Sequence, residues 1–134
     1  MIKREKEILE ASNFPFIMDI HGSGKDSNHY YLLLEYIKGA SFDKVIVELD
    51  VLTCEQLTFY MSNIMVLLNY LHDRCIVYRD LKPENLVTDQ FGYLKLIDFG
   101  TAKILSTYDN NDDEDALERT FTIIGTPHYT APEI

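Results

Sequence analysis

The 134-residue sequence predicts an α+β fold, because it combines segments of helical periodicity with short strand-like runs. Two segments, residues 2–11 and 53–72, place apolar side chains at helical spacing. Strand-like runs, bounded by turn-forming residues, occur at residues 16–21, 30–36, 86–88 and 93–97. The composition, 46% hydrophobic and 25% charged, is that of a globular chain rather than a disordered one.

The first predicted helix, residues 2–11, is rich in charged residues and has Ile8 and Leu9 on its buried side. It ends before Pro15, because a proline disfavours the helical conformation of the residue that precedes it. Residues 22–28 hold glycine, serine and asparagine, which predicts a hairpin connection between the first two strands. The Gly-Ser-Gly-Lys run within it lacks the three-glycine spacing of a phosphate loop, so it is not predicted to bind phosphate.

A short helix is predicted from Ser41 and a longer one from Thr53. Thr53 and Gln56 form a capping-box pattern, in which each side chain binds a free backbone amide at the helix start. We expect the apolar residues that recur along the longer helix to pack in the core: Leu57, Met61, Ile64, Met65, Leu68 and Leu71. Residues 89–92 predict a turn between the last two strands, and the pattern beyond Gly100 is loop-like.

The formal net charge of −10 is concentrated in one segment, because residues 109–118 carry six acidic side chains and no basic one. Such an acidic balance argues against nucleic-acid binding, which requires a basic surface. We expect the segment to be a solvated insertion. Docking on a basic partner and repulsion of a phosphorylated loop are the alternatives.

Neither a membrane span nor a signal peptide is expected, since no apolar run approaches about 20 residues and the N-terminus is charged. The two cysteines, Cys54 and Cys75, lie far apart and form no metal-binding pattern. Two reduced thiols in a cytoplasmic protein are the expectation.

Three motifs carry the chemical information. Residues 78–85 are Tyr-Arg-Asp-Leu-Lys-Pro-Glu-Asn, residues 98–100 are Asp-Phe-Gly, and residues 131–133 are Ala-Pro-Glu. Phosphoryl transfer from ATP needs a carboxylate beside the acceptor hydroxyl, metal ligands that bridge the phosphates, and a cation near the developing charge. The motifs supply these residue types in the expected order: Asp80, Lys82, Asn85 and Asp98.

These motifs resemble the catalytic loop, metal-binding triplet and activation-segment anchor of eukaryotic protein kinases. The resemblance implies that Asp80 orients the substrate hydroxyl and accepts its proton, and that Lys82 stabilises charge on the transferred group. It implies ATP and Mg²⁺ as cofactors, with Asn85 and Asp98 as metal ligands. Lysine at position 82 resembles serine/threonine rather than tyrosine kinases, so protein serines and threonines are the implied acceptors.

Tyr78 narrows the resemblance to the AGC group of kinases, many other kinases having histidine there. The Asn-Phe-Pro-Phe run at residues 13–16 resembles that group's connection after helix αC. Residues 120–129 resemble the activation segment of cGMP- and cAMP-dependent kinases. That branch implies regulatory cyclic-nucleotide-binding domains outside this chain.

In the activation segment, the resemblance makes Thr122 the phosphorylation site, with Arg79 and Lys103 as the cationic partners of its phosphate. The family's third partner, a histidine, falls at Met1 and is missing. Thr126 matches the threonine that hydrogen-bonds the catalytic aspartate and lysine.

For the nucleotide, the resemblance makes Glu5 the helix αC glutamate. Residues 34–37 match the hinge: Leu34 would be the gatekeeper, and the backbone of Glu35 and Ile37 would bind adenine. The stacked apolar residues that link the two lobes of active kinases would be Leu9, Ile20, Tyr78 and Phe99.

For the substrate, Glu84 matches an acid that binds an arginine near the acceptor in kinases that prefer basic substrates. A second family acid falls at Ser41, which weakens that preference, although Asp43 lies nearby in the sequence.

The implied fold is part of the protein kinase fold: helix αC, the end of the N-lobe sheet, the hinge, the first part of the helical C-lobe and the activation segment. Residues 1–36 would be the remnant of the N-lobe with the hinge, and residues 37–134 the first part of the C-lobe. The glycine-rich loop and the ATP-binding lysine have no counterpart, so the isolated chain is expected to be inactive. We interpret the chain as a segment of a genuine kinase. The alternatives are a truncated, pseudokinase-like binding module and a nonfunctional remnant.

Overall fold

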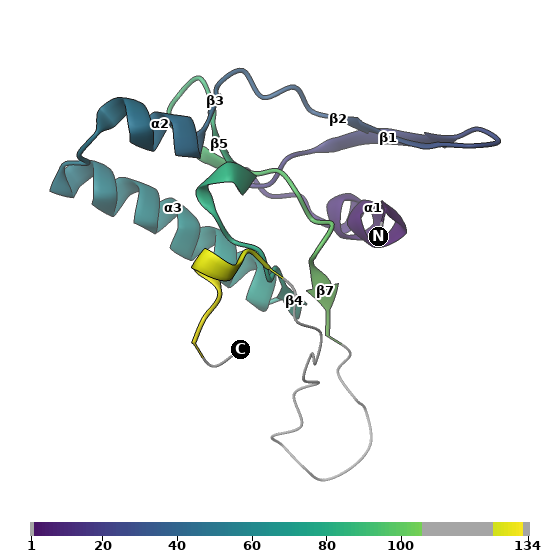
Figure 1. The fold of residues 1–134 in the computed structure, drawn as a ribbon. Coiled ribbons are helices and arrows are strands. Elements are labelled where there is room, and N and C mark those ends of the chain that lie inside the picture. The colour runs from purple at the N-terminus through teal and green to yellow at the C-terminus, as the bar shows by residue number, and fades with distance from the viewer. Residues whose placement is uncertain (1, 106–124, 133–134) are drawn as a thin grey trace, which may run out of the picture.

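The computed structural model describes residues 2–105 and 125–132 (Figure 1). Its helices and strands confirm the α+β class. In chain order they are α1 (Ile2–Ala11), β1 (Ile20–Lys25), β2 (Tyr30–Leu34), β3 (Ala40–Ser41), α2 (Phe42–Leu49), α3 (Cys54–His72), β4 (Ile76–Val77), the 3-10 helix η1 (Pro83–Asn85), β5 (Leu86–Thr88), β6 (Leu94–Leu96), β7 (Lys103–Ile104) and the 3-10 helix η2 (Pro127–Tyr129).

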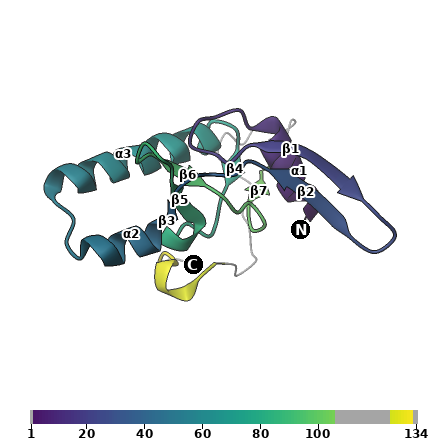
Figure 2. The same ribbon diagram turned by 90° about the horizontal axis from the view of Figure 1, so that it is seen from above.

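Helix α1 and the β1–β2 hairpin lie at one end of the molecule, and α2 and α3 lie at the other, in both ribbon views (Figures 1 and 2). Between them, β3, β5 and β6 form an antiparallel sheet with β5 in the middle. The short strands β4 and β7 pair separately.

The predicted boundaries of the first hairpin were wrong. The strand expected at residues 16–21 begins only at Ile20 and continues to Lys25, because the glycines and serine of that run pair with β2. The connection is shorter than predicted: Asp26 closes it by accepting hydrogen bonds from the amides of Asn28 and His29, both at 2.7 Å. Ile17 instead forms a single parallel bridge with Leu96 of β6.

Gly39 is required where the chain crosses the sheet before β3. A Cβ atom at this position would lie 1.6 Å from the carbonyl oxygen of Thr88, which is far inside van der Waals contact. On the other side of this crossing, the Thr88 hydroxyl donates to the carbonyl of Ala40 at 2.9 Å. The close approach holds the start of α2 against β5.

One core joins both ends of the molecule. It contains Ile8 and Leu9 of α1, as predicted, with buried residues of the other helices, of the strands and of the segments that connect them: Ile17, Phe42, Leu67, Leu71, Ile76, Tyr78, Leu86, Leu94, Leu96, Phe99 and Ala102.

The expected core stripe of α3 was wrong in part. Leu71 is buried, and Ile64 and Leu68 are half-buried, but Leu57, Met61 and Met65 are 50%, 47% and 64% exposed. Helix α3 is apolar on more than one face, and its buried residues, Asn63, Leu67 and Leu71, lie on the face that meets the core within the described residues. Periodicity alone does not say which of two apolar faces is covered.

No helix in the described part of the chain is long and apolar enough to cross a membrane.

Candidate active site

The segment that follows β4 carries the predicted catalytic loop. β4 and β7 pair antiparallel, so residues 76–77 and 103–104 hold the two ends of the segment 78–102 together. Arg79 sits in the left-handed region with φ of 71°, a conformation that a non-glycine residue adopts at a cost of about 1–3 kcal/mol. Its Nε atom donates to the carbonyl of Thr101 at 2.7 Å. This bond ties the loop to the Asp-Phe-Gly segment.

The other three predicted catalytic residues meet around the carboxylate of Asp80. Thr126 donates from Oγ1 to Oδ1 at 2.8 Å, while Lys82 Nζ lies 2.9 Å from Oδ2 and 2.8 Å from Thr126 Oγ1. Asn85 donates from Nδ2 to Oδ2 at 3.1 Å and to the backbone carbonyl of Asp80 at 2.9 Å. Both carboxylate oxygens of Asp80 are therefore held in place by side chains.

This network keeps Asp80 ionised. Burial alone would raise the pKa of Asp80, but the hydrogen bonds from Lys82, Thr126 and Asn85 outweigh burial, and the pKa lies below the ordinary value. The pKa of Lys82 is raised in turn, chiefly by its bond to Asp80. The site thus pairs a carboxylate and an ammonium, each in its charged form at neutral pH.

Thr126 is positioned by the glycine before it. Gly125 has φ of 129°, and a Cβ there would lie 2.9 Å from the carbonyl oxygen of Arg79. Only glycine lets the C-terminal segment approach the catalytic loop this closely.

The Asp-Phe-Gly segment acts on Glu5 of helix α1. Asp98 Oδ1 accepts the amide of Gly100 at 2.8 Å, and the amide of Ile97 bonds the carbonyl of Asn85 at 3.1 Å. Burial, and next the charge of Asp98, raise the pKa of Glu5, whereas the amide of Phe99 acts in the opposite direction. Helix α1 thus presents Glu5 to the Asp-Phe-Gly segment.

The four predicted stacking residues lie in the common core. The rings of Tyr78 and Phe99 meet edge to face with centroids 5.5 Å apart, and Leu9 and Ile20 pack in the same cluster. The Tyr78 hydroxyl is buried and finds no hydrogen-bond partner within the described residues. Burial, followed by the charge of Asp98, raises the pKa of Tyr78 far above its ordinary value.

A model of the protein kinase domain family matches residues 1–134 of this chain. The chain belongs to this family. It is 43% identical over 133 residues to the cGMP-dependent protein kinase of Plasmodium berghei (strain Anka), covering 99% of this chain and 14% of that protein. It is 39% identical over 132 residues to a Caenorhabditis elegans protein named cAMP-dependent protein kinase, catalytic subunit-like, covering 98% of this chain and 30% of that protein.

These relatives confirm the predicted resemblance to cyclic-nucleotide-dependent kinases. A cGMP-dependent protein kinase of Toxoplasma gondii is 40% identical over 133 residues, which are 99% of this chain and 12% of that protein. The chain spans less than a third of the length of each of these three relatives.

The residues of this kinase segment fit a magnesium ion that arrives with a nucleotide. Within residues 2–105 and 125–132, no three His, Cys, Asp or Glu side chains gather into a metal site of their own. Mg²⁺ usually takes one or two protein oxygens and completes its shell with phosphates and water. Asp98 offers its Oδ2, and Asn85 uses its nitrogen toward Asp80, which leaves the amide oxygen outside that network.

Sequence reasoning missed Lys95, although it lies next to the predicted hinge. Leu34 ends β2, and the side chain of the following Glu35 is bound by Lys95 Nζ at 2.7 and 2.8 Å. A lysine between two leucines in a predicted strand was the signal for a buried partner. Its partner could not be named, because Glu35 is 60 positions away.

Two predicted residues are only partly accounted for. Thr122 lies outside the described residues, while its predicted partners lie on the catalytic loop (Arg79) and at the start of β7 (Lys103). Glu84 lies in η1, which contacts α2.

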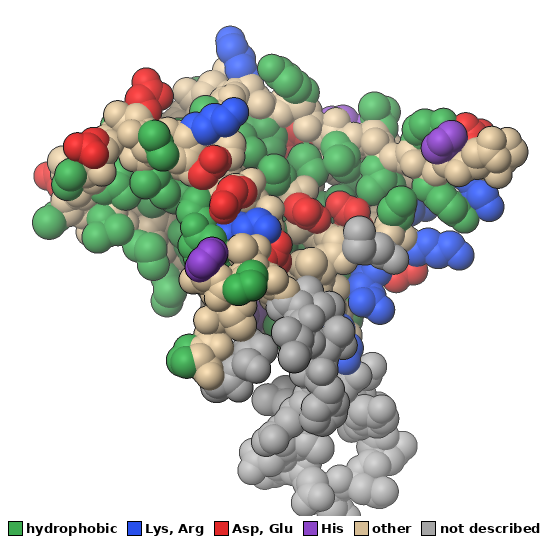
Figure 3. Space-filling model, in the orientation of Figure 1, with side chains coloured by type: hydrophobic (Ala, Val, Ile, Leu, Met, Phe, Trp, Pro, Cys, Tyr) green, Lys and Arg blue, Asp and Glu red, His purple; other side chains and the backbone are tan. Residues whose placement is uncertain are grey.

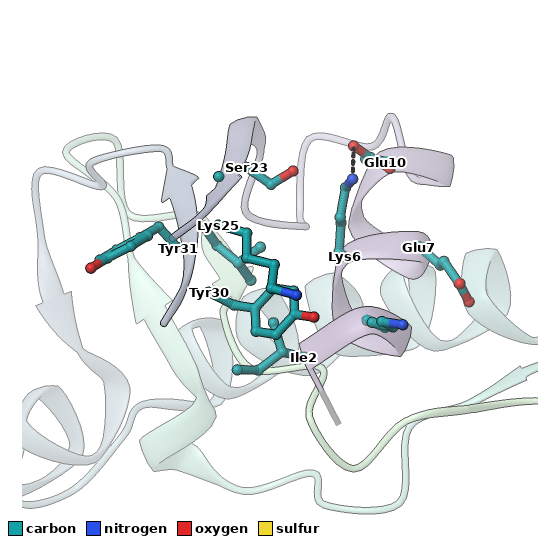
Figure 4. Close-up of a pocket in the computed structure, with 11 residues that line it drawn as sticks. Ile2, Lys6, Glu7, Glu10, Ser23, Lys25, Tyr30 and Tyr31 are labelled. Atoms are coloured by element: carbon teal, nitrogen blue, oxygen red, sulfur yellow. Dashed lines mark ion pairs between the residues drawn. The ribbon is translucent and has the colours of Figure 1, made fainter. Parts of the chain in front are cut away.

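A cavity of about 410 Å³ lies between α1 and the β1–β2 hairpin (Figure 4). Lys6 and Glu10 form an ion pair at 3.5 Å on its α1 side, and Lys25 lies 4.9 Å from the ring centroid of Tyr30 on its hairpin side. No residue predicted for the active site lines this cavity. It is separate from the catalytic loop.

Proposed function

We propose that this protein is a serine/threonine kinase that transfers the γ-phosphoryl group of ATP to protein hydroxyl groups. One observation carries the proposal: the carboxylate of Asp80 is held at both oxygens by Lys82, Asn85 and Thr126. A carboxylate kept ionised and oriented in this way suits a group that must receive the proton of an alcohol.

Each residue of the network has a distinct part in this reaction. Asp80 orients the acceptor hydroxyl and takes its proton as the new oxygen–phosphorus bond forms. Lys82 brings positive charge to the transferred group, and Thr126 fixes both side chains relative to one another. When bound, ATP supplies the phosphoryl group and Mg²⁺ neutralises its charge.

The nucleotide would be held by residues of α1, of the hinge, of η1 and of the segment after β6. Asn85 and Asp98 would hold Mg²⁺, and the charge of Asp98 acts on Glu5 of α1. The backbone of Glu35 and Ile37 would receive adenine, with Leu34 as the gatekeeper. We assign residues 1–36 to the N-lobe and hinge and residues 37–134 to the C-lobe.

A basic protein substrate is the partner that the surface charge favours. Acidic side chains gather over the middle of one face, between α2 and the C-terminal segment (Figure 3). Glu84 lies in η1, and the Asp43 carboxylate accepts a hydrogen bond from Ser41 in the neighbouring first turn of α2. Asp43 thus lies within one hydrogen bond of position 41, where the second substrate acid was expected.

Control of activity would act through the activation segment and through domains outside this chain. Phosphorylation of Thr122 would add negative charge that Arg79 and Lys103 can bind. The names of the relatives support control by a cyclic nucleotide. Two free cysteines, Cys54 and Cys75, support an intracellular location, where thiols stay reduced.

The proposal is tested by measuring phosphoryl transfer from ATP to a serine peptide with arginines before the acceptor, using the full-length protein. Asp80→Asn should lower kcat by roughly a hundred- to ten-thousand-fold, because the proton acceptor is lost. Asp73→Asn removes an exposed carboxylate at the end of α3 and should leave kcat unchanged. Equal rates for the parent and Asp80→Asn would contradict the proposal.

A further inference from the structure

Glu35 and Lys95 form an ion pair that joins the hinge to strand β6. Lys95 Nζ lies 2.7 Å from Oε1 and 2.8 Å from Oε2 of Glu35, so one ammonium binds both carboxylate oxygens. The two side chains are 23% and 15% exposed, whereas those of the Lys6–Glu10 pair on α1 are 39% and 51% exposed. A sheltered pair is screened less by water and salt than an exposed one.

The other side of Glu35 is bound to Asp19. The amide of Asp19 donates to Oε2 of Glu35 at 3.0 Å, and the amide of Glu35 donates to the carbonyl of Asp19 at 2.8 Å. Burial would raise the pKa of Glu35, but the bonds from Asp19 and Lys95 outweigh burial and lower the pKa. Glu35 is therefore fixed through its backbone and its side chain together.

Lys95 is held in place by the strand to which it belongs. It lies in β6 between Leu94 and Leu96, which are buried, and it faces Val87 of β5 in the sheet. Leu96 in turn donates to the carbonyl of Phe16 at 2.8 Å and accepts from the amide of Met18 at 3.0 Å. Strand β6 lies at the centre of the view in Figure 2, and the chain reaches Asp98 two residues after its end.

We propose that Lys95 is a positioning residue for nucleotide binding, which acts through Glu35 to hold the hinge backbone in a fixed place relative to Asp98. The inference rests on the proposed function, which assigns adenine to the hinge and Mg²⁺ to Asp98. The hydrogen bonds of the Lys95 ammonium go to Glu35.

Removing the ammonium of Lys95 leaves the Glu35 carboxylate without its cation. The carboxylate then turns toward water, the amide of Asp19 loses its acceptor, and the hinge backbone becomes more mobile. Binding of adenine weakens, because a less ordered hinge must be ordered on binding. The Asp80 network has no bond to this pair, so the chemical step is unchanged once the nucleotide is bound.

The test compares the full-length parent protein with its Lys95→Gln and Lys95→Arg variants. Three quantities are measured: adenosine affinity by calorimetry, KM and kcat for ATP, and hydrogen exchange of the amides of residues 35–37. We expect Lys95→Gln to weaken adenosine binding and raise KM roughly tenfold, the effect of one charge-assisted contact. Its kcat stays within about twofold of the parent value, because only ground-state binding is lost.

The controls separate positioning from a general loss of charge. Lys95→Arg keeps the cation and should retain most of the affinity. Lys6→Gln removes the exposed pair with Glu10 and should match the parent in all three measurements. If Lys95→Gln does not fold, the double variant Lys95→Gln/Glu35→Gln removes both charges and should show the same weakened adenosine binding.

Parent-like adenosine affinity and hinge exchange in Lys95→Gln, or a lower kcat at unchanged KM, would overturn this inference and leave the proposed function standing. A parent protein that neither binds adenosine nor transfers phosphate would instead overturn the proposed function, and this inference with it.

Discussion

Thr126 completes the Asp80 network from a segment 46 positions further along the chain. It donates to Asp80 and accepts from Lys82, both at 2.8 Å, and so sets the spacing between the Asp80 carboxylate and the Lys82 ammonium. A hydroxyl is needed for both bonds, since it can donate and accept at once.

Thr126→Ala should therefore lower kcat roughly a hundredfold, the effect of misplacing a catalytic group by about 1 Å. Thr126→Ser keeps the hydroxyl and should retain most of the parent rate in the same peptide assay. A Thr126→Ala variant as fast as Thr126→Ser would show that the hydroxyl does not position Asp80.

The lowered pKa of Asp80 also makes a prediction about stability. A carboxyl whose pKa is lower in the folded state than its ordinary value of 3.8 stabilises the fold above that pH, and loses this effect as the pH falls toward the folded-state pKa. Urea unfolding should therefore show a gap in unfolding free energy between the parent and Asp80→Asn that changes with pH. Below about pH 4 the parent should lose stability relative to the variant. A gap that stays constant on acidification would contradict the role given to Lys82, Thr126 and Asn85.

Among the elements, α3 supports the catalytic loop by packing one face against the core. Its start is fixed by the predicted capping box: Thr53 Oγ1 accepts the amide of Gln56 at 3.2 Å, and Gln56 Oε1 accepts the amide of Thr53 at 2.9 Å. Its end leads through a short turn to β4, which begins the catalytic loop. The buried face near this end, Leu67 and Leu71, thus holds the loop in place.

Leu71→Ala should lower the unfolding free energy by about 2–5 kcal/mol, because it leaves a cavity in a fully buried site. Met65→Ala, on the exposed face of the same helix, should change it by less than about 0.5 kcal/mol. Chemical denaturation of both variants measures the difference, and equal losses would show that Met65 is covered too.

Local signals predicted the elements better than they predicted their surroundings. Helix α1 and strand β5 have the expected bounds, because a proline and a turn define them locally. The first strand was misplaced, because the glycines of β1 resemble a loop until β2 pairs with them. The covered face of α3 and the Glu35–Lys95 pair depend on residues far away in the sequence, which a single sequence does not bring together.

For the whole molecule, the sheet connects the two halves of the proposed active site, which are the Asp80 network and the place proposed for the nucleotide. Residues 80–85 and Thr126 hold the proposed proton acceptor and cation, and the hinge, Glu5 and Asp98 belong to the place proposed for the nucleotide. Motif order predicted that the residues of the first half belong together, and their hydrogen bonds agree with this. The link between the halves, through Lys95 and the bridge at Leu96, emerged only from the fold.

The separate roles proposed for Asp98 in nucleotide binding and for Asp80 in the chemical step are tested most directly by calorimetry of Mg²⁺–ADP binding to the full-length protein. The Asp98→Asn and Asp80→Asn variants are compared side by side. We expect Asp98→Asn to weaken binding more than about tenfold, because a metal ligand is lost, and Asp80→Asn to bind within about threefold of the parent. Removal of Mg²⁺ should weaken the parent and leave Asp98→Asn little changed. Equal binding by the parent and Asp98→Asn, with and without Mg²⁺, would contradict the account.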